Sequence, residues 1–99
     1  MEIKNLNSFL QVATTQNFTK AASILGYSQS NISVHIQQLE EELGVLLFNR
    51  LSKKVVLTQY GEALIPYAKQ CLSSALQIES LFQNDTVLKG NIRIGFTES

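Results

Sequence analysis

Apolar residues at helical spacing organise the first part of the chain. They recur every three or four residues, the spacing of one helix face, at Leu6, Phe9, Leu10 and Ala13. This pattern predicts a first helix over about residues 4–15. A short second helix is expected to follow, because Thr19 is a good N-cap residue and Gly26 suits the left-handed conformation just past a helix end.

A third helix is predicted between Ser28, which can cap its start, and Gly44, which can end it. Its apolar residues form one narrow stripe, made of Ile32, Ile36, Leu39 and Leu43. A short connection that contains a glycine separates this helix from the second one, as in a helix-turn-helix. We therefore expect the third helix to be the reading helix of such a motif.

The segment after the third helix predicts a two-stranded hairpin, or wing. Leu46, Leu47 and Phe48 are expected to continue the core. Residues 49–54 are polar and basic, and residues 55–57 return as an apolar, largely β-branched run.

A long helix is predicted after Thr58, which can cap it. Its apolar residues alternate intervals of four and three, which is a heptad seam, at Leu64, Ala68, Cys71, Ala75, Ile78 and Phe82. A kink is expected at Pro66, since a proline inside a helix removes a backbone hydrogen bond. So short a chain offers the seam no partner, so we interpret it as a dimer interface with Cys71 as a small buried hydrophobe.

The predicted fold class is mainly α: a winged helix-turn-helix of three helices plus a two-stranded wing, followed by a long dimerisation helix. The expected divisions are residues 1–58 for the winged helix-turn-helix, 59–83 for the linker and dimerisation helix, and 84–99 for a hinge and the first strand of a truncated second domain. That strand is indicated by residues 91–96, which alternate polar and apolar side chains.

Charge changes this picture little. Eight Lys/Arg against eight Asp/Glu give a net charge of zero, which by itself argues against a nucleic-acid partner. The charges are unevenly placed, however. Arg50, Lys53 and Lys54 lie within five residues, and an acidic run occupies residues 40–42. A neutral total can therefore conceal a basic edge.

Other sites find little support in the sequence. The single cysteine excludes an internal disulfide and has no partner at metal-ligand spacing, so we expect no metal site and a reducing compartment. No leader-like segment and no run of eighteen apolar residues occurs, so we expect a cytoplasmic protein without a membrane span. With one histidine, no nucleophile–base motif and no phosphate-binding loop, no catalytic residue is predicted.

Outward positions of the third helix carry the candidate chemistry. They are small or amide side chains that suit close approach to a DNA major groove, namely Gln29, Ser30, Asn31, Ser33, Val34 and Gln37. Glutamine can bond adenine bidentately, serine can bond several bases, and a small apolar group can pack on a thymine methyl. An ordinary solvated helix face is the competing interpretation, and it weighs most for Gln37, far from the helix start.

Several motifs in order resemble the N-terminal domain of LysR-type transcriptional regulators. They are residues 17–22 (NFTKAA), 28–33 (SQSNIS), 39–44 (LEEELG), 47–50 (LFNR) and 57–61 (LTQYG). The resemblance covers nearly the whole chain. It implies a winged helix-turn-helix, a linker helix that dimerises, and a larger C-terminal domain that senses a small molecule, into which residues 88–95 would lead.

The resemblance also implies partners and further contacts. We expect sequence-specific binding to double-stranded DNA with an interrupted inverted repeat, as a homodimer or, in a longer chain, a tetramer. No cofactor is expected in this fragment. Arg50 matches the family's wing-root arginine, Lys53 and Lys54 would lie at the wing tip beside DNA, and Lys20 is a weaker phosphate candidate. The bland alternative for the wing is a solvated charge cluster.

Two departures from the family pattern limit what carries over. Ser30 stands where the family usually has proline, and Val34 where it often has arginine, so base preference does not transfer. His35 could replace a phosphate contact, but a lone histidine on a helix flank is more often merely exposed.

Two alternatives stay open besides an enzyme. A winged helix used only for protein interaction would have an apolar reading face and an uncharged wing. A different winged-helix regulator family is disfavoured by residues 39–44 and by the long linker helix.

Overall fold

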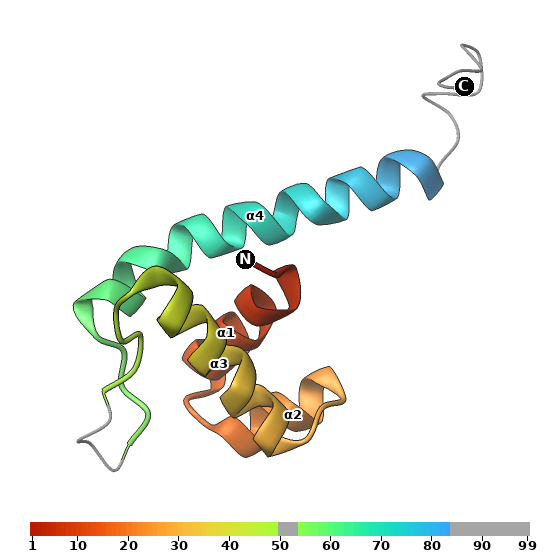
Figure 1. Cartoon of the computed structure of the whole chain (residues 1–99). Helices are drawn as coiled ribbons and strands as arrows, with labels where there is room; N and C mark the ends of the chain where they lie inside the picture. The colour runs from red at the N-terminus through yellow and green to blue at the C-terminus, as the bar shows by residue number, and fades with distance from the viewer. Residues whose placement is uncertain (50–53, 84–99) are drawn as a thin grey trace.

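The computed structural model describes residues 1–49 and 54–83, and these form four helices. They are α1 (Ile3–Thr15), α2 (Phe18–Leu25), α3 (Gln29–Leu43) and α4 (Gln59–Gln83). Figure 1 shows α1, α2 and α3 packed into one body, with α4 running across one end of it and continuing well beyond. The mainly helical fold class and the order of the helices are as predicted.

The helix ends follow local capping chemistry. The N-cap of α2 is Asn17 and not Thr19, because the Asn17 side-chain oxygen accepts the N–H of Lys20 at 2.9 Å. Thr19 is instead the second residue of α2. The caps of α3 are confirmed: the Ser28 hydroxyl accepts the N–H of Asn31 at 3.1 Å, and Gly44 ends the helix with a φ of 74°.

The core lies where α1 meets the other three helices. Fully or almost fully buried apolar side chains come from every part of the body, and they are Leu6, Phe9, Val12, Ala21, Ala22, Ile32, Ile36, Leu39, Leu47, Phe48 and Ala68. The Phe48 ring joins them, with its centroid 5.6 Å from that of Phe9 and 6.1 Å from that of Phe18. Such tilted and edge-on pairs are favourable ring geometries.

Two residues predicted to lie in the core do not. Leu43 is 37% exposed and Leu46 is 52% exposed. Leu43 occupies the last turn of α3, and the chain then reverses at Gly44. After the reversal Leu47 fills the core and leaves Leu46 outside it.

The two arms of the predicted wing are joined at their base. Phe48 and Leu57 form an antiparallel bridge, and the N–H of Asn49 donates to the carbonyl of Val56 at 2.7 Å. Arg50 and Lys53 lie outside the described residues, so the bridge is the part of the wing on which the structure bears.

Packing at the start of α4 fixes the wing base to the long helix. The Thr58 hydroxyl accepts the N–H of Gly61 at 3.1 Å, which confirms the predicted cap. Gly61 is buried, and a Cβ there would collide with the Leu47 carbonyl oxygen and lie 2.6 Å from a methyl carbon of Leu57. A glycine is needed here because two backbone segments touch.

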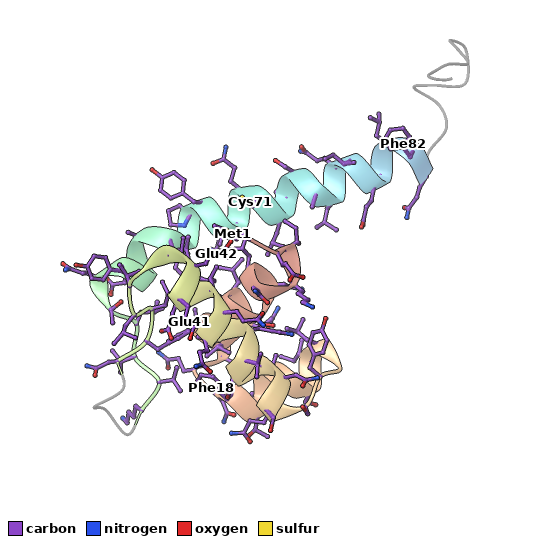
Figure 2. All side chains as sticks on the ribbon, in the orientation of Figure 1. Met1, Phe18, Glu41, Glu42, Cys71 and Phe82 are labelled. Carbon is purple, nitrogen blue, oxygen red and sulfur yellow. The ribbon has the colours of Figure 1, made fainter. Side chains whose placement is uncertain are left out.

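The heptad seam of α4 is divided between two environments. Ala68 is 1% exposed and belongs to the core of its own chain, and Leu64 packs beside that core. The prediction that Ala68 lies in a dimer interface is therefore wrong, because the body of the same chain already covers it. Cys71 is exposed, against its predicted burial, and Ile78 and Phe82 are 59% and 62% exposed. Figure 2 shows Phe82 at the far end of α4, away from the body.

Candidate nucleic-acid interface

The outward face of α3 carries the side chains expected to read DNA. Its six candidate residues are all exposed in the structure: Gln29, Ser30, Asn31, Ser33, Val34 and Gln37. The opposite face is buried against the body through Ile32, Ile36 and Leu39. One face thus anchors the helix while the other presents amide and hydroxyl groups to solvent.

A hollow of about 600 Å³ adjoins the start of α3. It is lined by the N-terminal end of α2, by Gln29, and by residues 54–56 of the wing. Lys54 lies at this hollow and is exposed, and Lys20 is exposed on the first turn of α2. The structure therefore brings one wing lysine close to the start of the reading helix. Arg50 and Lys53 fall outside the described residues.

Gln29 is already engaged by a neighbouring helix. The Thr19 hydroxyl of α2 donates to the Gln29 side-chain oxygen at 3.1 Å. Sequence reasoning treated Thr19 only as a helix cap and missed this contact. The signal was indirect: in a helix-turn-helix, the first turns of the second and third helices converge, so exposed polar residues at both starts are candidates for bonding.

The acidic run does not face solvent as one patch. Glu40 is 6% exposed, and its carboxylate accepts the N–H of Leu47 at 2.7 Å and that of Phe48 at 3.4 Å. Glu41 accepts the side-chain amide of Gln37 at 3.5 Å. Glu42 pairs with the Met1 ammonium at 2.6 Å. One of the three carboxylates is thus a structural acceptor that ties α3 to the wing base.

His35 is neither a phosphate contact nor an exposed flank residue. It is 7% exposed, its Nδ1 lies 2.7 Å from the Ser8 hydroxyl of α1, and its ring meets the Tyr27 ring edge-on at 4.9 Å. Burial, and secondarily the nearby charge of Lys4, lower the pKa of His35 below its ordinary value, while Glu2 acts in the opposite direction. A neutral imidazole holding α1 to α3 fits this environment. Ser8 was missed, because it gave no sequence signal beyond its place on the first helix.

An apolar groove of about 510 Å³ runs along α4. It is lined by Ile3 of α1 together with α4 residues that include Cys71, Ala75 and Ile78. Three members of the predicted seam therefore share one groove. Within residues 1–49 and 54–83, no cluster of three or more metal-ligating side chains occurs, and no helix is both long and apolar enough to cross a membrane.

Comparison with known protein families gives one match over most of the chain. The model for "bacterial regulatory helix-turn-helix protein, lysR family" matches residues 3–62. The match begins with α1 and ends in the first turn of α4, so it spans the helix-turn-helix, the wing and the buried Gly61 contact.

Individual relatives agree. The transcriptional regulator BudR of Klebsiella aerogenes is 42% identical over 102 residues, covering all of this chain and 70% of BudR. The regulator YwqM of Bacillus subtilis is 36% identical over 99 residues, and there the chain spans 34% of the relative's length. Among solved structures, the complex of the BenM DNA-binding domain with catB site 1 DNA is similar, with a TM-score of 0.79 and 40% identity over 86% of this chain and 94% of that one.

Proposed function

This chain belongs to the LysR family of bacterial regulatory helix-turn-helix proteins, whose members are transcriptional regulators and not enzymes, and from that premise we propose how it reads DNA. The outward face of α3 enters the major groove, and the wing lies against the backbone or in the minor groove. Gln29, Ser30, Asn31, Ser33, Val34 and Gln37 contact bases or adjacent phosphates, and Lys20, Arg50, Lys53 and Lys54 contact the backbone.

The observation that carries this proposal is the division of α3 into two faces. Ile32, Ile36 and Leu39 are completely buried, so the helix cannot rotate without breaking the core. The opposite face is consequently held outward, and its amides and hydroxyls match the hydrogen-bonding groups on major-groove base edges. Lys54 beside the start of α3 supplies positive charge where a phosphate would pass.

Domain organisation follows the same division. Residues 1–58 act as the winged helix-turn-helix, 59–83 as the dimerisation helix, and 84–99 lead into a second domain of a longer protein. That second domain binds a small-molecule effector and makes a tetramer available. DNA binding places the protein in the bacterial cytoplasm, where the chromosome is accessible.

We propose a symmetric dimer that binds an interrupted inverted repeat. Cys71, Ala75 and Ile78 line one apolar groove of α4, and Phe82 lies exposed further along the same seam. A second copy of α4 covers this distal part of the seam, to which Leu64 contributes at its inner end. A two-fold dimer presents two α3 helices and therefore matches a repeat with two-fold symmetry.

The test is a pair of substitutions that separate base reading from backbone binding. A duplex is first selected from a randomised library of roughly 30 base pairs, long enough for two half-sites at least one helical turn apart. Gln29→Ala should weaken binding to that duplex by about 1–3 kcal/mol and leave a scrambled duplex nearly unaffected. Lys54→Ala should weaken both alike, and should lower the slope of log K against log salt by about 0.9 per lost phosphate contact, or about 1.8 in a dimer.

Fluorescence anisotropy over a salt series measures both quantities. If Gln29→Ala weakens the selected and scrambled duplexes equally, Gln29 does not read a base. If the slope is unchanged in Lys54→Ala, Lys54 packs in a solvated loop and does not touch DNA.

A further inference from the structure

The first turns of α2 and α3 are joined by one side-chain hydrogen bond. Thr19 is the second residue of α2 and Gln29 is the first residue of α3. Both are exposed, and the Thr19 hydroxyl donates to the Gln29 carbonyl oxygen at 3.1 Å. Both residues also line the hollow that Lys54 adjoins. The bond therefore lies at the surface where we propose that DNA binds.

This bond leaves the Gln29 amide able to read a base. A glutamine carbonyl oxygen has two lone pairs and the amide nitrogen has two N–H groups. Thr19 uses one lone pair. A bidentate contact with adenine needs one further acceptor and one donor, and both are still available on Gln29. The bond thus fixes the plane of the amide without occupying the groups that would pair with DNA.

From this geometry we infer that Thr19 is a positioning residue that determines specificity, because it holds the Gln29 amide in the orientation needed for base reading. The inference rests on the proposed function and extends it to a residue that need not touch a base. It assigns α2 a part in sequence selection.

The physical basis is the cost of ordering a flexible side chain. Glutamine has several rotatable bonds, and immobilising such a side chain in an interface opposes binding. A side chain that is held before DNA arrives has less freedom left to lose. From the usual cost of such ordering, loss of Thr19 should weaken selected-duplex binding by about two- to tenfold. A scrambled duplex, to which Gln29 makes no bidentate bond, should not respond.

A direct contact between Thr19 and phosphate would behave differently. Threonine hydroxyls commonly bond phosphate oxygens, and such bonds carry no sequence information. Removing one would weaken selected and scrambled duplexes together and would not depend on the residue at position 29. The two roles are therefore separable by the specificity ratio and by a double-mutant cycle.

The experiment compares Thr19→Val, Thr19→Ser and the matched control Thr14→Val in the 99-residue chain. Valine keeps the shape of threonine and removes the hydroxyl, whereas serine keeps the hydroxyl. Thr14 is exposed on α1 and does not line the hollow. Affinities are measured for the selected duplex of roughly 30 base pairs and for its scrambled form, with each fold checked by circular dichroism.

We expect Thr19→Val to bind the selected duplex about two- to tenfold more weakly and the scrambled duplex as well as the unmodified chain does. Thr19→Ser should restore affinity, and Thr14→Val should change neither. In a Gln29→Ala background, Thr19→Val should cause no further loss.

Three results would overturn the inference: equal weakening on both duplexes, additive losses in the double variant, or no loss in Thr19→Val. These leave the proposed function standing as long as Gln29→Ala still discriminates between the duplexes. If Gln29→Ala alone fails to discriminate, the role proposed for Gln29 is wrong and the inference fails with it.

Discussion

The three-helix body and the distal half of α4 use apolar residues in opposite ways. In the body, the stripe of α3 is covered completely at Ile32, Ile36 and Leu39. In the distal half of α4, residues at equally regular spacing leave most of their surface in solvent, as Ile78 and Phe82 do. Figure 1 shows the reason, since α4 extends beyond the body and no other helix of the described chain lies along its far end.

The comparison teaches that an apolar period does not identify what covers it. Ala68 and Ile78 belong to one heptad seam, yet Ala68 contacts its own chain and Ile78 is exposed. The change occurs where α4 passes the edge of α1, around Cys71 and Ala75. The body should therefore fold independently of concentration, whereas the distal seam should respond to concentration.

The largest expected effect comes from emptying the body. Phe9 is completely buried and its ring meets that of Phe48, so Phe9→Ala should lower the free energy of unfolding by about 3–5 kcal/mol. Phe82→Ala, at an exposed site, should change it by about 0.5 kcal/mol or less when the chain is monomeric. Urea denaturation followed by circular dichroism measures both. Equal effects would remove the distinction between the two regions.

The buried carboxylate of Glu40 tests how the body holds the wing. Glu40→Ala removes the acceptor of the Leu47 and Phe48 N–H groups and should cost about 2 kcal/mol of unfolding free energy. Glu41→Ala is the matched control, because that exposed carboxylate makes only a long contact with Gln37, and it should cost about 0.5 kcal/mol or less. If both substitutions cost the same, Glu40 does not anchor the wing base.

The distal seam should affect assembly before it affects folding. Ile78→Glu and Phe82→Glu should each weaken self-association at least about tenfold, which corresponds to about 1.4 kcal/mol. Gln77→Glu adds the same charge at another exposed position of α4 and should have a smaller effect. Sedimentation at tens of micromolar, an order of magnitude suited to an interface of standard size, reports the result. A monomeric unmodified chain under these conditions would contradict the proposed dimer.

The smallest effect is a pH dependence within the body. Because the folded pKa of His35 is lowered, the unfolded chain binds this proton more readily than the folded chain does. Stability should be fully present above the unfolded pKa near 6.5 and should fall as the pH drops from there toward the lower folded pKa. The slope for one proton stays below about 1.4 kcal/mol per pH unit.

Urea midpoints between about pH 7.5 and pH 5.5, a range that brackets the ordinary histidine pKa, measure this slope. His35→Gln should flatten it, whereas His35 variants of the binding face do not arise because the ring is buried. Ser8→Ala retains the titrating ring and serves as the control. An equal slope in the chain with and without His35 would show that other groups cause the dependence.

The sequence by itself determined the elements and the family. Periodic apolar residues, together with Ser28, Gly44 and Thr58 at helix ends, were sufficient because capping and helical periodicity are local properties of the chain. The polar face of α3 was predictable for the same reason, since burying one face of a helix exposes the other. The fold class was confirmed, while the DNA contacts remain predictions.

Only the tertiary structure decided the residues whose roles depend on distant neighbours. His35 is buried because Ser8 and Tyr27 approach it, and Glu40 is a structural acceptor because the chain returns to it at Leu47. Thr19 reaches Gln29 because the starts of α2 and α3 converge. Each depends on a contact between segments that local pattern does not relate, and the same is true of the point on α4 where intrachain packing ends.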